Sequence, residues 1–173
     1  MKAKTDYSAW PITDIFREGH AGLSLLIATA AWALLGPSWL AVGVTLVIVS
    51  VEPLPDLDSR IKPILDDRFG ITIEHRGPTH SLTFAGAIGV MIGAIGLVPG
   101  YPIILGAAAL CSILGHLAGD VITPMGVRPL WPLRDRAISL DLWRAWNEPL
   151  NAISLLAGLS AIMTAITLSV APL

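Results

Sequence analysis

The sequence predicts an all-α fold, a polytopic transmembrane helical bundle of about five helices with two charged cytoplasmic loops. Of its 173 residues, 54% are hydrophobic and only 14% are charged, whereas an ordinary soluble domain carries more charge. No Asp, Glu, Lys or Arg occurs in residues 19–51, 77–119 or 149–173, and each of these gaps is long enough for at least one membrane span. The whole chain, 1–173, is expected to form one membrane-embedded domain.

Turn residues divide the gaps into individual helices. A Gly-Pro-Ser turn at 36–38 and a Pro-Gly-Tyr turn at 99–101 split the first two gaps into hairpins, because proline cannot continue a helix. The first helix is expected to begin near Thr13 or Asp14. The other four helices are expected within residues 39–51, 80–98, 102–121 and 150–171.

The basic residues indicate how the chain crosses the membrane. All 11 Lys and Arg residues lie in the N-terminal segment and in the loops over 52–76 and 120–148. If five helices cross the membrane in alternating directions, these three segments lie on the same side. Positive charge is retained on the cytoplasmic side, so we expect a multi-pass cell-membrane protein with its C-terminus outside. The net charge of −2 without a basic block gives no reason to expect nucleic acid as a partner.

Glycines in the third predicted helix form a packing surface. Gly86, Gly89, Gly93 and Gly96 recur at spacings of three or four, which leaves a strip without side chains along one face. Such strips allow helix backbones to approach closely within membranes. We therefore expect the third helix to pack tightly against a neighbour.

All four histidines lie at predicted cytoplasmic ends of helices. His20 opens the first helix, His75 and His80 lead into the third, and His116 lies near the end of the fourth. An ionisable group at such a depth is costly unless it has a partner. Four imidazoles at one level therefore indicate a shared site rather than four separate core residues.

Carboxylates accompany these histidines. His116 and Asp120 are four residues apart on one helix, so their side chains share a face and can bind one cation, or form a hydrogen bond at the helix end. Two prolines within residues 52–56 are expected to end the second helix and force an extended segment. Alternate residues of an extended segment point the same way, which would bring Asp56 and Asp58 together.

The segment before the third helix supplies a third cluster. Gly-Pro at 77–78 predicts a bend, after which His80 occupies the first helical turn with Thr79 as N-cap. Arg76 offers a planar guanidinium suited to a phosphate or carboxylate, so it is the candidate for binding an anionic substrate. The alternative interpretation of Arg76 is a cytoplasmic anchor.

Imidazole and carboxylate ligands without thiolates suit a divalent metal, zinc first, with manganese or iron as alternatives. Seven candidate ligands exceed the needs of one tetrahedral ion, so one or two ions are expected. Metal ions activate water and stabilise the oxygens of a phosphoester during hydrolysis. The candidate proton carriers are Glu52, Glu74 and Glu148. The candidate ligands are His20, Asp56, Asp58, His75, His80, His116 and Asp120.

Three motifs together resemble the YdjM-like family of membrane-bound hydrolases predicted to be metal-dependent. They are Pro-Asp-Leu-Asp at 55–58, His-Arg-Gly-Pro-Thr-His-Ser at 75–81 and Gly-His-Leu-Ala-Gly-Asp at 115–120, and the resemblance extends over about residues 20–133. It implies a multi-pass membrane protein with a metal site and no settled substrate. The His-x-x-x-Asp element is also similar to one in zinc-dependent phospholipase C, which favours phosphoesterase chemistry by analogy.

The sequence thus leads to a membrane-bound metal-dependent hydrolase that acts at the cytoplasmic face. Its expected substrate is an anionic small molecule or a lipid-linked phosphoester, with membrane lipid as its surroundings. An ion or metal transporter is the first alternative, and it would require polar groups across the whole bilayer. A non-catalytic membrane scaffold is the second, and it would bind no metal.

Overall fold

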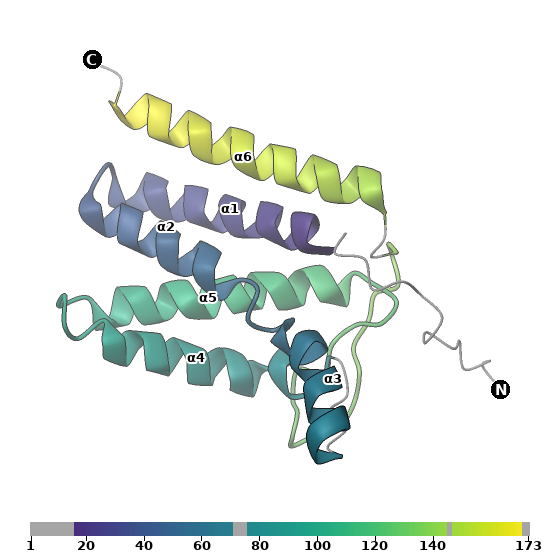
Figure 1. The fold of residues 1–173 in the computed structure, drawn as a ribbon. Helices are drawn as coiled ribbons and strands as arrows, with labels where there is room; N and C mark the ends of the chain where they lie inside the picture. The colour runs from purple at the N-terminus through teal and green to yellow at the C-terminus, as the bar shows by residue number, and fades with distance from the viewer. Residues whose placement is uncertain (1–15, 71–75, 145–146, 171–173) are drawn as a thin grey trace.

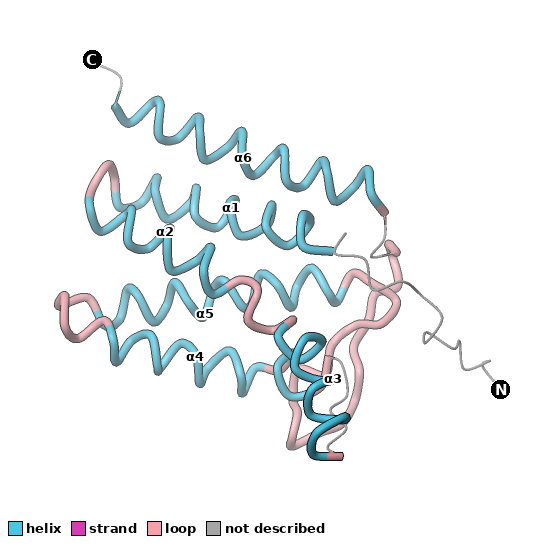
Figure 2. The backbone as a smooth tube through the Cα atoms, in the orientation of Figure 1, coloured by secondary structure: helices cyan, strands magenta, loops and turns pink. Residues whose placement is uncertain are grey.

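The computed structural model describes residues 16–70, 76–144 and 147–170, and these residues form helices joined by turns and loops, without a β-strand (Figures 1 and 2). A short 3-10 turn covers Pro78–His80. The prediction of an all-α bundle is confirmed. The α-helices are α1 (Phe16–Leu35), α2 (Trp39–Val51), α3 (Leu57–Phe69), α4 (Leu82–Ile95), α5 (Pro102–Val121) and α6 (Glu148–Val170).

The five apolar helices lie side by side, and α3 lies across one end of them (Figure 1). Helix α1 packs between α6 on one side and α2 and α5 on the other, while α5 also packs against α4. Buried apolar residues such as Ala28, Ile48 and Ile113 fill the spaces between these helices. Because successive helices alternate in direction, the start of α1, the end of α2, the start of α4 and the end of α5 all meet at the end that carries α3.

Both predicted hairpins are confirmed. Gly36 adopts the left-handed conformation (φ 65°) directly after α1, and Ser38 caps α2 by accepting a hydrogen bond from Ala41 N at 3.2 Å. Helix α5 begins with Pro102, a position where the missing N–H removes no helical hydrogen bond. The turn residues therefore stop and restart the helices where the sequence indicated.

The lengths of the helices decide which of them can cross a bilayer alone. Glu18–Leu35, Pro102–Val121 and Glu148–Val170 are long and apolar enough. Helices α2 and α4 have 13 and 14 residues, or about 20 Å of helix, against a hydrocarbon core of about 30 Å. All five predicted helices are thus present as apolar helices, and two of them extend through only part of the core. Large apolar side chains on their outer faces are exposed, as expected for a surface that meets lipid.

The segment after Pro55 differs from the prediction. Asp56 has helical backbone angles (φ −78°, ψ 0°), and the next 13 residues form α3, which ends at the left-handed Gly70. The expected extended segment is therefore wrong, because the fixed φ of proline is also compatible with the approach to a helix. Asp56 and Asp58 consequently do not alternate along a strand.

The start of the third apolar helix also differs. The helix begins at Leu82, and Ser81 rather than Thr79 is its N-cap, accepting a hydrogen bond from Phe84 N at 3.1 Å. The Ser81 hydroxyl in turn donates to Pro78 O at 2.7 Å, which stabilises the preceding 3-10 turn. The predicted start of the first helix, at Thr13 or Asp14, lies outside the described residues.

Close contact between α4 and α5 uses the predicted glycine strip. A Cβ atom on Gly106 of α5 would lie 2.8 Å from the carbonyl oxygen of Gly89, and Gly93 and Gly96 are similarly close to α5 or its first residues. Gly86, by contrast, faces open space. The packing prediction is therefore confirmed for three of the four glycines and wrong for Gly86.

Gly106→Ala is expected to lower the stability of the bundle, whereas Gly86→Ala is expected to leave it equal or slightly higher. The first methyl group overlaps backbone atoms of α4, and overpacking of this kind costs about 1–3 kcal/mol. The methyl group added at position 86 has no atom within 4 Å. Within a helix, alanine is favoured over glycine by about 1 kcal/mol. Thermal unfolding of the two purified variants in the same detergent measures this difference, and equal midpoints would contradict the packing described.

Candidate metal centre

Five of the predicted ligands converge at the end of the bundle that carries α3. They come from distant parts of the sequence, and each lies at or beside the end of a helix. Four of them are almost fully buried, and the side chain of Asp56 is 28% exposed. The converging residues are His20 of α1, Asp56 before α3, His80 before α4, and His116 and Asp120 of α5.

Two imidazole nitrogens each lie close to the same two carboxylate oxygens. His80 Nε2 lies 3.4 Å from Asp56 Oδ1 and 3.3 Å from Asp120 Oδ2. His116 Nε2 lies 3.6 Å and 3.5 Å from the same two atoms. Tetrahedral metal bonds of about 2.0–2.1 Å place neighbouring ligand atoms about 3.3–3.4 Å apart. The four separations between a nitrogen and an oxygen are close to this spacing.

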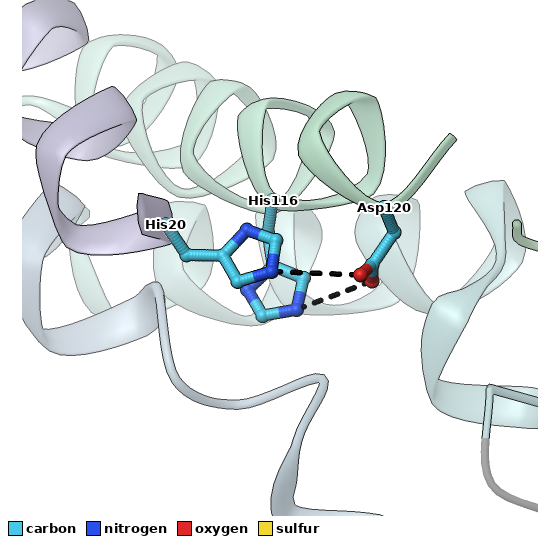
Figure 3. Close-up of side chains that lie close together, drawn as sticks. All are labelled: His20, His116 and Asp120. Carbon is cyan, nitrogen blue, oxygen red and sulfur yellow. Dashed lines mark ion pairs between the residues drawn. The ribbon is translucent and has the colours of Figure 1, made fainter. Parts of the chain in front are cut away.

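A second group of possible ligands adjoins the first. The imidazole of His20 stacks on that of His116, with ring centroids 3.9 Å apart and planes at 9° (Figure 3). His20 Nε2 lies 3.5 Å from Asp120 Oδ1. The ligand atoms within each of two groups, Asp56, His80 and His116 in one and His20, His116 and Asp120 in the other, lie within 4.8 Å of one another. Both groups could hold a metal ion.

The hydrogen bonding of the centre also fits a cation. Within the part of the chain that the structure describes, His116 Nε2 and Asp120 Oδ2 are buried and form no hydrogen bond. A buried polar atom without a hydrogen bond costs about 1–3 kcal/mol. Coordination to a metal would satisfy both atoms at once, so the residues present suit the ion that their chemistry implies.

An outer ring of acceptors orients the two imidazoles. His116 Nδ1 lies 3.3 Å from Glu52 Oε1 at the end of α2. His80 Nδ1 lies 3.1 Å from the hydroxyl of Thr79, which itself donates to Asp58 Oδ2 at 3.2 Å. If both Nδ1 atoms carry the proton, both Nε2 atoms direct a lone pair to the centre. Outer carboxylates commonly hold metal-binding histidines in this way.

Asp58 lies beside the two ligand groups rather than within them. Its Oδ2 accepts a hydrogen bond from the backbone N–H of Arg76 at 3.0 Å and lies 3.7 Å from His80 Nδ1. Arg76 has a left-handed backbone (φ 60°), a conformation that costs about 1–3 kcal/mol outside glycine. The buried Asp58 carboxylate therefore stabilises both a strained residue and the outer side of His80.

The guanidinium of Arg76 is turned into the protein. Its Nη2 lies 2.6 Å from Asp120 Oδ1, and its Nη1 donates to Thr123 Oγ1 at 2.7 Å. Arg76 is only 7% exposed. It thus compensates the buried charge of Asp120, whereas the sequence had suggested a role in binding an anionic substrate.

The surroundings shift the pKa values of the two groups that lie outside the apolar helices. Burial opposes ionisation of Asp56, but its interactions with His116 and His80 outweigh this and hold the pKa of its carboxyl well below the usual range. Burial likewise opposes protonation of His80, but Asp120 and Asp56 outweigh it and raise the pKa of the imidazole. Both shifts show that the centre favours positive charge among its carboxylates.

A family model described as YdjM inner membrane protein matches residues 16–172. The chain belongs to the YdjM inner membrane protein family. No curated protein and no solved structure matches it. The YdjM match confirms the resemblance seen in the motifs and a location in the membrane, and its description names no reaction.

The remaining predicted site residues of this YdjM-family chain have different positions. His75 and Glu74 lie outside the described residues. Glu148 is exposed at the start of α6, whereas Glu52 is buried against His116. The sequence offered no way to choose Glu52 among the acids, because its position depends on how α2 and α5 are aligned.

Replacing Glu52 with Gln is expected to weaken metal binding by about 10- to 100-fold, the usual effect of losing an outer carboxylate. The Gln amide is neutral and can donate a hydrogen bond to His116 Nδ1. The proton of the imidazole is then no longer held on Nδ1, so Nε2 is no longer kept free to bind the metal. Competition with a chelator of known affinity measures the change. Glu148→Gln is the matched control and should bind metal as the wild type does; equal affinities of all three proteins would contradict the role of Glu52.

Proposed function

We propose that this protein is a metal-dependent hydrolase that cleaves a phosphate ester at the membrane surface. The proposal rests above all on two adjoining groups of histidine and aspartate side chains whose ligand atoms lie within 4.8 Å of one another. Zinc is the preferred ion because two imidazoles and two carboxylates without a thiolate suit it, and manganese or iron are alternatives. Asp56, His80 and His116 would hold one ion, and His20, His116 and Asp120 are the candidate ligands of the other group.

A bound ion would supply a Lewis acid for the phosphoryl oxygen and activate water near neutral pH, which is the chemistry needed to hydrolyse a P–O ester bond to phosphate and an alcohol. Several side chains would support such a metal site. Glu52 and Asp58 lie beside the imidazoles of His116 and His80, and Arg76 forms an ion pair with Asp120. The partly exposed Asp56 leaves one side of the centre open to solvent.

The position of the centre supports a substrate that resides at or reaches the membrane surface. The ligands lie at the ends of apolar helices, beside the two charged loops. Because those loops hold most of the basic residues, we infer that the centre faces the cytoplasm. A phosphate ester attached to a lipid could reach such a depth by lateral diffusion.

A transporter is less well supported than a hydrolase. An ion pathway needs polar or ionisable groups along the membrane. Among the described apolar helices, α2 and α4 contain no Asp, Glu, Lys, Arg or His, and those of α1, α5 and α6 lie at the end that carries the centre. A scaffold is less well supported as well, because a scaffold has no use for converging buried imidazoles and carboxylates.

His116→Ala and Asp56→Ala are each expected to remove most of the bound metal and to lower phosphoester hydrolysis by more than about 100-fold, beyond the loss typical of an outer-shell change. Metal analysis of the purified proteins and turnover of a chromogenic phosphate ester measure the two effects. Asp67→Ala, which alters an exposed acid of α3, is the control. Full metal content in both ligand variants, or hydrolysis that survives metal removal, would sink the proposal.

A further inference from the structure

The two ligand groups of the candidate metal centre share one imidazole, that of His116. The first group is Asp56, His80 and His116, and the second group is His20, His116 and Asp120. His116 Nε2 lies 3.6 Å from Asp56 Oδ1 and 3.5 Å from Asp120 Oδ2, and an imidazole nitrogen has one lone pair for one ion. The other ring nitrogen, Nδ1, faces Glu52 Oε1 at 3.3 Å. If one group binds an ion through His116, the other group therefore loses this ligand.

The carboxylate of Asp120 is also shared, with one oxygen toward each group. Its Oδ2 lies 3.3 Å from His80 Nε2 and 3.5 Å from His116 Nε2, and both of these histidines belong to the first group. Its Oδ1 lies 3.5 Å from His20 Nε2 (Figure 3). The same oxygen lies 2.6 Å from Arg76 Nη2. A second ion, bound between His20 and Asp120 Oδ1, would therefore adjoin a guanidinium.

Arg76 is held in this position by both its side chain and its backbone. Its Nη1 donates to Thr123 Oγ1 at 2.7 Å, and its backbone N–H donates to Asp58 Oδ2 at 3.0 Å. The residue is 7% exposed, so salt and water screen its charge weakly, and a guanidinium is not deprotonated in proteins. Because like charges repel strongly in a buried site, Arg76 opposes the binding of a cation to Asp120 Oδ1.

We propose that the centre holds a single metal ion, in the first group, and that the guanidinium of Arg76 takes the place of a second ion. This inference rests on the function proposed above, and it means that the hydrolase would use one ion rather than a pair. Arg76 is then a positioning residue, which holds Asp120 Oδ1 while Oδ2 faces the first group. His20 stacks on His116 and contacts Asp120 without binding the ion.

The number of zinc ions bound per chain tests this proposal. The full-length protein in detergent is stripped of metal with a chelator, the chelator is removed, and the protein is titrated with zinc alone by calorimetry. The wild type should bind one ion. His20→Ala should also bind one ion because the first group is intact, whereas Asp56→Ala should lose most of the binding.

Two substitutions of Arg76 test its role directly. Arg76→Met removes the charge and should allow a second, weaker zinc ion to bind, which raises the number bound from one toward two. Arg76→Lys is the matched control, since it has the same backbone strain but keeps a positive charge, and it should bind one ion. A folded Arg76→Met protein that binds only one ion would overturn the role of Arg76. If that variant does not fold, the comparison of His20→Ala with Asp56→Ala still decides how many ions bind and where.

The outcomes separate the number of ions from the proposed reaction. Two ions in the wild type, one of which is lost in His20→Ala, would overturn the single-ion centre and leave the hydrolase in place. A single ion that is lost in His20→Ala and kept in Asp56→Ala would also overturn it, because the ion would then lie in the second group. One ion in the first group without turnover of a chromogenic phosphate ester would retain the single-ion centre and remove the hydrolase. A wild type that binds no zinc, manganese or iron would overturn both.

Discussion

The structure depends on how a carboxylate is accommodated at the end of an apolar helix. Asp120 is 1% exposed, and a buried charge is stable only where partners surround it. Arg76, His20, His80 and His116 all meet its two oxygens. Yet the described residues of the cluster bring four carboxylates together with one guanidinium, so negative charge remains in excess. The imidazole of His80, whose pKa is raised, offsets part of this excess when it is protonated, and a bound divalent cation would balance the rest.

The helical bundle determines the register of this cluster. Ser112 donates to the carbonyl oxygen of Ile48 at 2.7 Å, which connects α5 to α2 one turn from His116 and Glu52. Glycines let α4 approach α5, and the 3-10 turn at the start of α4 carries His80. Helices α1 and α5 thus hold His20, His116 and Asp120, whereas the turns before α3 and α4 supply Asp56 and His80. Ligands held in this way would be preorganised for a cation.

The sequence allowed much of this arrangement to be predicted, because membrane spans and turns leave strong local signals. Charge-free gaps and Gly-Pro turns identified five apolar helices, and their alternation placed His20, His80 and His116 at one end. Helix α3 was missed because the two prolines just before it were expected to force an extended segment. The contacts of Glu52 and the inward turn of Arg76 were beyond prediction, since both depend on side-chain packing between helices that are distant in sequence.

X-ray absorption at the metal edge of the purified full-length protein tests the central claim most directly, because it reports the ligand atoms themselves. The account predicts a bound ion with nitrogen and oxygen neighbours at about 2.0–2.1 Å, including the multiple-scattering signal of at least two imidazoles. A protein that takes up no metal under any condition, or an ion bound without imidazole, would contradict it.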